Sequence, residues 1–488
     1  MTGDNLWTLT ATAAVDLLKR GAVSPLELVE AAAERIADTD GTLNAMPTLC
    51  VDRARDHARR IMSEGKDRER PPAWLAGLPV AIKDLNDVAG VRTTYGSPIY
   101  ADHVPERSDV MVERLEENGA IVIGKSNTPE FGAGASTFND VFGKTHNPWN
   151  TGKQVAGSSG GAAAALAAGQ VWLATGSDLG GSLRTPASFN AVIGLRPAPG
   201  RVPHGPKPRP FSTLSVEGPM ARTAEDCALF LDAMVGAHPE DPIALPAPAD
   251  SYLAAVRARR APKRVAFSPD LGLLPVDPQV MALCREAAEA FAGMGVVVEE
   301  TCPDFADAPE TFQTLRAAGF AANMAPLLRE HRDKLKPEVI WNIEKGLALS
   351  ADEIGRAEVA RGALYYRVVE FFRTYDLLLC PAAIVPPFDV DIRYVEQVGD
   401  HRFDNYVDWL GITFAITLTS CPALSAPAGF TADGLPVGLQ IMGPPRGEAA
   451  VLSAAALLDE ATGIARRLPI DPQVADSTTR RPAETAAG

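Results

Sequence analysis

The sequence lacks the residue pairs that usually bind a metal ion or form a disulfide framework. Its six cysteines are widely spaced with no Cys-x-x-Cys pair, and its seven histidines include no His-x-x-x-His or His-Glu-x-x-His pattern. Dispersed cysteines are typical of reduced, mostly buried thiols. The sequence therefore predicts no metal site, and the chemistry derived below requires neither a metal nor another cofactor.

Positive charge is scarce as well. Lysine and arginine number 46 against 61 aspartates and glutamates, which gives a net charge of −15 and disfavours nonspecific binding to nucleic acid or to an anionic membrane. No apolar run reaches the ~18 residues of a membrane helix, and residues 1–7 contain neither a basic nor an apolar leader segment. We expect a cytoplasmic protein without nucleic-acid or membrane partners, present as a monomer or a homodimer.

Strand and helix patterns alternate along the chain, which favours an α/β fold with a mixed, mostly twisted β-sheet sandwiched between α-helices. Residues 24–27 form a capping box that begins a helix, and residues 197–210, with six prolines, predict a stiff surface loop. We expect one domain over residues 1–471 and a polar C-terminal tail over residues 472–488. The other expected elements are residues 78–83, 108–118, 120–124, 171–175, 223–235, 264–268, 278–294, 296–300 and 377–381.

Two glycine-rich turns in residues 155–184 predict a catalytic site. They read GSSGG at residues 157–161 and GSDLGGS at residues 176–182, and they bracket a small-residue helix and a short apolar strand. Because glycine adopts positive φ without strain, such turns let backbone N–H groups converge, as in an oxyanion hole. Upstream, Lys83 ends an apolar run, where burial would lower its pKa and make it a suitable base for a serine nucleophile.

With these residues, the chain resembles the amidase signature family, whose enzymes hydrolyse amides with a Ser-Ser-Lys triad. Lys83, Ser158 and Ser182 lie at the spacing that this family keeps. The resemblance implies the amidase signature fold, with a signature core over about residues 75–225, and a small-molecule amide as substrate. Further matching segments are residues 124–131, 147–149, 194–197, 217–222 and 434–440.

The resemblance implies a role for each residue of the triad. Lys83 takes the proton of Ser158, Ser158 relays the proton of Ser182, and Ser182 attacks the carbonyl to form an acyl-enzyme. The family also has a cis peptide before the bridging serine, here Gly157–Ser158. The implied oxyanion hole consists of the backbone N–H groups of Leu179, Gly180, Gly181 and Ser182. The implied supporting residues are Asp178, Arg184, Ser159 and Ser177.

The substrate pocket is also inferred from the resemblance. In the family, the residues after the Thr-Pro-Glu-Phe segment line the pocket, and here they are the small residues Gly132, Ala133, Gly134 and Ala135. Small side chains in the pocket wall leave space for a large substrate group. We therefore expect bulky or aryl amides as substrates, with carbamate or ester cleavage as a side activity. Residues 305–347 are expected to supply the rest of the wall, with Phe312, Phe320, Met324 and Trp341 as candidates.

Three alternatives remain open at this point. The family includes the glutaminase subunit of a tRNA-dependent amidotransferase, although the arginines and tyrosines of residues 355–366 do not match the pattern expected of its glutamine site. Residues 119–126 (GAIVIGKS) match a P-loop, although a helix pattern precedes them and Asn-Thr-Pro follows. Residues 157–161 match a nucleophile elbow with Ser159 as nucleophile, although residues 147–154 before them read as a loop rather than a buried strand.

Overall fold

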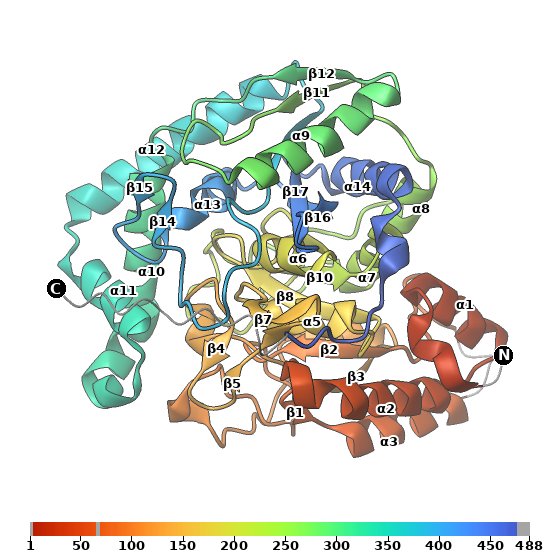
Figure 1. The fold of residues 1–488 in the computed structure, drawn as a ribbon. Helices are drawn as coiled ribbons and strands as arrows, with labels where there is room; N and C mark the ends of the chain where they lie inside the picture. Colours follow the sequence, from red (N-terminus) through yellow and green to blue (C-terminus); the bar gives the residue numbers. More distant parts are fainter. Residues whose placement is uncertain (1–2, 65–68, 476–488) are drawn as a thin grey trace.

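The computed structural model describes residues 3–64 and 69–475, and eleven of its strands form one central sheet (Figure 1). Parallel pairs occur toward both ends of the sheet, and antiparallel pairs connect them through the middle. The predicted mixed sheet is therefore confirmed. In spatial order the strands are β1 (Thr48–Leu49), β3 (Ile121–Ser126), β2 (Pro79–Lys83), β8 (Leu173–Asp178), β10 (Val216–Ala221), β9 (Ile193–Arg196), β16 (Ala423–Phe430), β17 (Pro436–Met442), β13 (Leu377–Pro381), β11 (Arg264–Phe267) and β12 (Val297–Glu300).

Helices cover the sheet, so the middle strands are buried on both faces. Helices α5 and α6 pack together and against the strands, while α7, α9 and α14 form a second group against them. The helices are α1 (Ala11–Arg20), α2 (Pro25–Leu43), α3 (Val51–Ser63), α4 (Val110–Glu117), α5 (Gly160–Ala167), α6 (Arg184–Asn190), α7 (Ala224–Met234), α8 (Tyr252–Arg257), α9 (Pro278–Gly293), α10 (Ala308–His331), α11 (Pro337–Ala348), α12 (Ala351–Phe371), α13 (Gly411–Leu418) and α14 (Glu448–Thr462).

Small residues let helix α5 pack unusually close to its neighbours. It contains only glycine, alanine and one leucine, and every residue is buried. A Cβ atom built on Gly161 would lie 2.3 Å from the backbone nitrogen of Asn127 and 2.7 Å from the carbonyl oxygen of Ala45. Only glycine fits at this position, and the close packing fixes the turn that precedes the helix.

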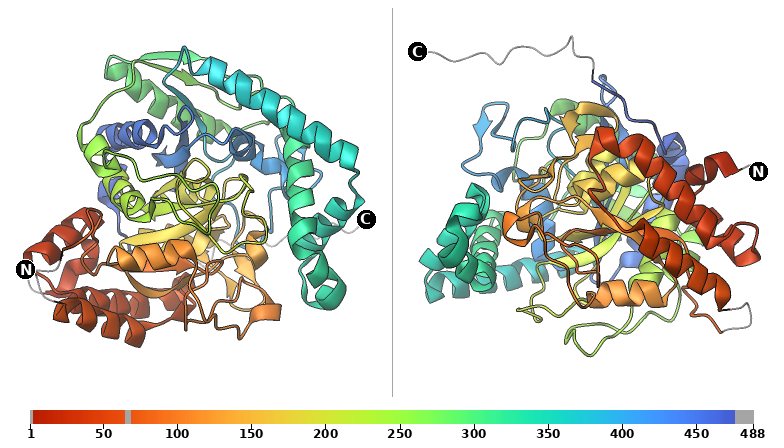
Figure 2. Two further views of the ribbon diagram at one scale, coloured as in Figure 1. Left: turned by 180° about the vertical axis from the view of Figure 1, so that it is seen from behind. Right: turned by 90° about the horizontal axis from the view of Figure 1, so that it is seen from below.

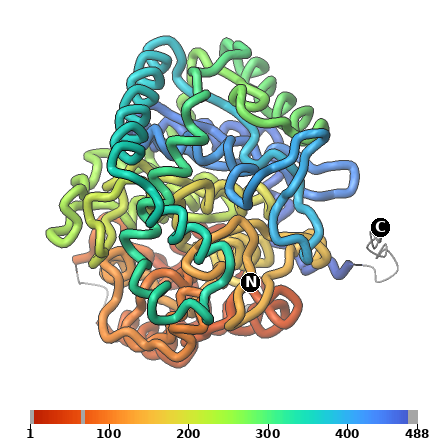
Figure 3. Tube along the Cα trace, turned by 90° about the vertical axis from the view of Figure 1, so that its left-hand side faces the viewer, coloured from red at the N-terminus to blue at the C-terminus, as the bar shows by residue number. Residues whose placement is uncertain are grey.

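Helices α10, α11 and α12 form an arm along one side of the molecule (Figures 1, 2 and 3). Helix α10 is the longest helix of the chain's described part and packs against α11, α12 and α13. Several of its side chains border the cavity described below. The arm therefore forms one side of that cavity.

Several local predictions are confirmed and others are wrong. The capping box forms, because the Ser24 hydroxyl accepts from the N–H of Glu27 and the Glu27 carboxylate accepts from the N–H of Ser24. Helix α4 starts at Val110 rather than Ser108, because the Ser108 hydroxyl instead accepts from the N–H of Ala89.

The longer segments predicted to be irregular also differ from expectation. Residues 147–154 are largely a hairpin of β6 (His146–Asn147) and β7 (Asn150–Gln154), separate from the central sheet. Residues 201–205 of the proline-rich loop are buried instead of lying on the surface. In the predicted tail, the N–H of Gln473 donates to the carbonyl of Pro148, and residues 476–488 lie outside the described part.

Within residues 3–64 and 69–475, no helix combines the length and apolar character needed to cross a membrane. All six cysteines are free thiols, and four of them are buried. The same part of the chain contains no cluster of three or more His, Cys, Asp or Glu residues arranged to hold a metal.

Candidate active site

Lys83 lies at the end of strand β2, between β3 and β8, and its side chain is 0% exposed. Its Nζ atom donates hydrogen bonds to three serine hydroxyls, at 2.7 Å to Ser158, 2.8 Å to Ser159 and 3.0 Å to Ser177. The backbone N–H of Lys83 donates to the Thr175 hydroxyl on β8, which holds the strand end in place. The predicted lysine and three of the predicted serines are thus in direct contact.

The environment of Lys83 favours the neutral amine. Burial lowers its pKa to about 7, against the weaker opposing influence of Glu217 and Asp178. In the described part of the chain no carboxylate lies within 4.0 Å of Nζ, so no ion pair stabilises the ammonium form. Near neutral pH, Lys83 can therefore accept a proton from a hydroxyl that it contacts.

The two predicted glycine-rich turns meet beside this lysine. Ser158 and Ser159 precede helix α5, and the Gly157–Ser158 peptide is cis, as the resemblance implied. Ser182 lines the same cavity as Ser158, and the N–H of Ser159 donates to the carbonyl of Ser182 at 3.2 Å. No hydrogen bond joins the hydroxyls of Ser158 and Ser182 among the described contacts. A relay between them requires the two side chains to move into hydrogen-bond distance.

Asp178 holds the second turn in place. Its buried carboxylate accepts from the N–H groups of Gly181 (2.9 Å) and Leu183 (3.2 Å) and forms a two-point ion pair with Arg184 at 2.9 and 3.0 Å. Arg184 and Arg196 hold the pKa of Asp178 well below its usual range, although burial opposes this shift. The carboxylate is therefore a fixed anion at the centre of the turn.

This arrangement corrects one predicted oxyanion donor. The N–H of Gly181 points to Asp178 and is not available to a substrate oxygen. Gly181 instead supplies the backbone conformation of the turn, with φ of +124°, which favours glycine. The N–H groups of Leu179, Gly180 and Ser182 have no hydrogen-bond acceptor among the described residues and remain available.

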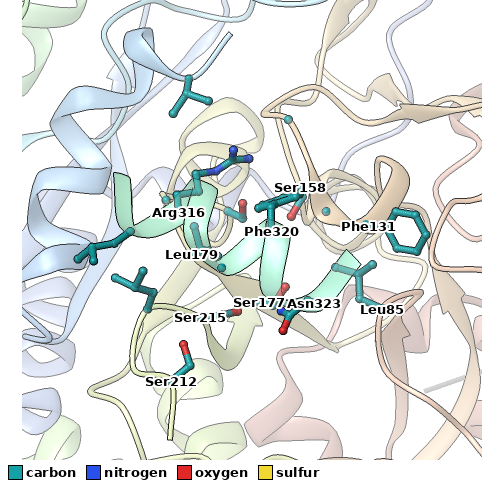
Figure 4. Close-up of a pocket in the computed structure, with 18 of the residues that line it drawn as sticks. Leu85, Phe131, Ser158, Ser177, Leu179, Ser212, Ser215, Arg316, Phe320 and Asn323 are labelled. Carbon is teal, nitrogen blue, oxygen red and sulfur yellow. The ribbon is translucent and has the colours of Figure 1, made fainter. Parts of the chain in front are cut away.

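A cavity of about 250 Å³ opens above the serines (Figure 4). Of the predicted wall residues, Gly132 and Gly134 border the cavity, as do three aromatic or apolar side chains of α10. These three are Phe312, Phe320 and Met324.

Three predicted wall residues lie elsewhere. Ala135 is buried in the main hydrophobic core and does not border the cavity. The side chain of Ala133 points away from the cavity and packs into a small apolar cluster with Phe320, Val339 and Ile343. Positive φ values at Phe131 and Gly132 reverse the backbone here, so adjacent residues face opposite sides. Trp341 packs edge-on against Tyr406 and borders a neighbouring groove.

The sequence interpretation missed the part of the wall that comes from the proline-rich loop. His204, Lys207 and Arg209 border the cavity. Lys207 forms a 2.9 Å ion pair with Glu217, and burial lowers the pKa of His204 to about 4, so this histidine is neutral. The basic residues between the prolines are the signal that could have indicated a binding surface.

The structure contradicts the P-loop interpretation. Residues 121–126 form strand β3, and Lys125 is buried in the sheet. Its Nζ donates to the carbonyl of Asn86 at 2.6 Å and the hydroxyl of Thr93 at 2.8 Å, and lies 3.5 Å from Asp84. A lysine bound in this way cannot reach a phosphate. The elbow interpretation also fails, because β7 before residues 157–161 lies outside the central sheet.

Comparisons with known proteins agree with this geometry. The family model described as Amidase matches residues 27–452. The chain is 35% identical to an acylamidase of Rhodococcus erythropolis, over 96% of this chain and 99% of that protein. It is also 35% identical to one subunit of the glutamyl-tRNA(Gln) amidotransferase of Moorella thermoacetica, over 95% and 99% of the two chains.

Solved structures show the same fold. A bacterial aryl acylamidase described as an amidase signature enzyme superposes with a TM-score of 0.86 at 28% identity, over 94% of this chain and 98% of the other. A 6-aminohexanoate cyclic dimer hydrolase superposes with a TM-score of 0.85 at 26% identity, over 95% and 99%.

Proposed function

The chain belongs to the amidase signature family and hydrolyses amide C–N bonds, and we propose that it does so with Ser182 as nucleophile, Ser158 as proton relay and Lys83 as base. The observation that carries this proposal is the 2.7 Å contact between Lys83 Nζ and Ser158 Oγ at a buried site without a carboxylate. A neutral lysine in such a contact is the base that a serine hydroxyl requires.

The first half of the reaction transfers the acyl group. Neutral Lys83 accepts the hydroxyl proton of Ser158 while the Ser158 oxygen accepts the proton of Ser182. The Ser182 oxygen bonds to the carbonyl carbon, and the carbonyl electron pair moves onto oxygen. N–H groups of the turn at residues 179–182 stabilise that oxyanion, and the loss of one such donor typically lowers kcat by ~10²–10³-fold.

The second half releases both products. The proton held by Lys83 passes back through Ser158 to the amine nitrogen as the C–N bond breaks, which leaves an ester on Ser182. Water then loses a proton to the same relay and attacks the ester carbonyl. The acid departs and Ser182 regains its proton, so that no group is consumed.

Bulky or aryl amides are the proposed substrates. Aromatic rings of Phe131, Phe312 and Phe320 border the cavity, which suits a flat apolar group. The relatives described as an acylamidase and as an aryl acylamidase support this choice. Carbamates and esters are proposed as side substrates because they pass through the same Ser182 intermediate.

Covalent labelling tests the assignment of the nucleophile. A fluorophosphonate is expected to label the wild type and Ser159→Ala, whereas Ser182→Ala loses both labelling and amide hydrolysis. Ser159→Ala is the matched control, because Ser159 contacts Lys83 in the same way as Ser158 but belongs to the elbow interpretation. Labelling that survives in Ser182→Ala and disappears in Ser159→Ala would overturn the proposal.

A second candidate function is that of the glutaminase subunit of a tRNA-dependent amidotransferase. It is favoured by the 35% identity to the Moorella thermoacetica amidotransferase chain over nearly the full length of both proteins. Hydrolysis of anilides by the purified single chain, with no stimulation on glutamine by added amidotransferase partner chains, would exclude it. Glutamine hydrolysis that requires those partners would instead replace the free-standing amidase.

We also propose that residues 1–471 fold as one domain and that the protein is a cytoplasmic monomer or homodimer. The single sheet, which contains strands from both halves of the chain, supports the first point. The acidic composition supports a freely dissolved protein. One cooperative unfolding transition and a sedimentation coefficient for one or two chains are the expected measurements.

A further inference from the structure

The cavity above Ser158 and Ser182 carries positive charge without negative charge. No aspartate or glutamate is among the described residues that line it, although the chain as a whole has a net charge of −15. Its basic lining residues are His204, Lys207, Arg209 and Arg316. An acid-free basic cavity in an acidic protein indicates that a ligand supplies the missing negative charge.

Two of these four residues are already neutral or neutralised. His204 is uncharged at neutral pH, because burial lowers its pKa to about 4. Lys207 forms its ion pair with Glu217 at 2.9 Å, so the two charges cancel. The arginines account for the uncompensated charge, because neither has a carboxylate within 4.0 Å among the described residues.

Arg316 is the stronger of the two candidates because it is only 7% exposed. Its guanidinium donates to the Asn342 side-chain oxygen and, at 2.8 Å, to the Tyr406 hydroxyl, and it lies over the rings of Phe320 and Tyr406. All of these partners are uncharged. A buried cation without an anion is unfavourable, so it indicates a functional use that the protein alone does not satisfy.

Arg209 approaches the same face of helix α10. A Cβ atom built on Gly319 would lie 2.6 Å from its Nη1 atom, so the guanidinium lies against a bare stretch of helix backbone. Gly319 is three residues from Arg316 and therefore on the same helix face. Figure 4 shows Arg316 and Phe320 on α10 beside Ser158 and Leu179. The two arginines thus border the same cavity as Ser158 and Ser182.

Resting on the proposed amidase function, we infer that the cavity selects amides that carry a carboxylate, with Arg316 as its main partner and Arg209 as a second one nearer the solvent. Arginine suits this role because its planar fork binds a carboxylate through two charge-assisted hydrogen bonds. The nearby carboxylate of Asp408 is not the partner of Arg316, because it accepts hydrogen bonds from Gln313 and Asn405.

Matched substrate pairs test the inference. Glutaranilic acid and valeranilide differ by a carboxylate on the acyl side, and 4-acetamidobenzoate and 4′-methylacetanilide differ by one on the amine side. The wild type is expected to prefer the acid of one pair by about ten- to a hundredfold in kcat/KM, the usual range for a hydrogen bond to a charged group. The pair that shows the preference identifies the half of the substrate that carries the charge.

Variants then assign the preference to a residue. Arg316→Gln is expected to lower the acid-to-neutral ratio to about one, Arg316→Lys to retain part of it, and Arg209→Gln to reduce it less. Lys345→Gln is the matched control, because Lys345 is a cation close to Arg316 that does not line the cavity, and its ratio stays at the wild-type value. An equal ratio in the wild type and Arg316→Gln, or a wild-type preference for the neutral members of both pairs, would overturn the inference.

Binding separates this inference from the proposed function. If the wild type hydrolyses no member of either pair, the amidase proposal fails for these substrates, and calorimetry with Ser182→Ala still decides the selectivity. Tighter binding of one acid than of its neutral partner, with the difference lost on adding Arg316→Gln, supports the carboxylate site. Equal binding within both pairs contradicts it.

Discussion

Two buried lysines lie on neighbouring strands, and their different surroundings suit them to different roles. Lys83 on β2 and Lys125 on β3 are both 0% exposed, and burial lowers the pKa of each. Lys125 lies 3.5 Å from the Asp84 carboxylate, whose charge opposes that shift, whereas Lys83 contacts only hydroxyls. Burial alone therefore does not distinguish the proposed base from a structural cation. The absence of a carboxylate in contact with Lys83 does.

The largest expected effect is the loss of catalytic activity when Lys83 is replaced. Lys83→Met is expected to lower kcat/KM by about 10²–10⁴-fold, the usual contribution of a general base. Lys83→Arg should be nearly as inactive, because arginine keeps the charge and cannot deprotonate. Steady-state assays on an anilide, with thermal melting to confirm folding, provide the measurement. An active Lys83→Arg enzyme would show that Lys83 acts as a structural cation, like Lys125.

The next largest effect is on stability and has the opposite pattern. Lys125→Met leaves the buried charge of Asp84 unpaired, so the free energy of unfolding should fall by about 3–5 kcal/mol. Lys83→Met removes an amine that is largely neutral above pH 7 and should have a smaller effect. Urea denaturation at pH 8 compares the two variants. Adding Asp84→Asn to Lys125→Met should restore part of the loss, and a double variant no more stable than Lys125→Met would contradict the ion-pair explanation.

The pH dependence of activity sharpens the comparison further. Only neutral Lys83 can accept a proton, and its pKa is about 7. We expect kcat/KM to fall about tenfold for each pH unit below 7 and to level off above it. Measurement of kcat/KM from pH 5 to 9 covers this decrease. Asp84→Asn removes the ion-pair partner of Lys125 and should leave the midpoint of the kcat/KM profile unchanged. A midpoint near the ordinary lysine pKa of ~10.4 would exclude a neutral base at neutral pH.

The smallest expected effect concerns the serine hydroxyls that contact Lys83, where an ion pair would have a carboxylate. Ser177→Ala removes the longest of the three Nζ contacts. A hydrogen bond of this kind contributes ~0.5–1.5 kcal/mol, so kcat/KM should fall by about two- to tenfold. The acidic limb of the profile should move to lower pH, because the ammonium form loses one acceptor. A change in rate without that shift would assign Ser177 to packing rather than to the lysine.

Local composition and the family resemblance were sufficient to predict that Lys83, Ser158 and Ser182 lie at one site, and the sequence predicted six of the eleven strands of the sheet. Lys83, Ser158 and Ser182 sit in turns and a strand whose composition dictates their local conformation. The wall was harder to predict, because Arg316 reaches the cavity from a distant helix. Ala133 was misplaced because positive φ at its neighbours reverses the side on which it points. The residue 147–154 hairpin depends on partners near residues 389 and 473, which no local pattern reveals.

The floor and the walls of the cavity come from different parts of the chain. The floor is formed by residues between Lys83 and Ser182, while the walls come largely from residues 204–215, helix α10 and residues 406–410. Natural variation or directed evolution can therefore exchange the walls while the reacting atoms stay in place. Libraries randomised at Asn323 and Met324, two cavity-lining residues of α10 that are not buried, should yield new substrate ranges at a low rate of inactive clones, whereas randomising around Asp178 should mostly destroy the enzyme.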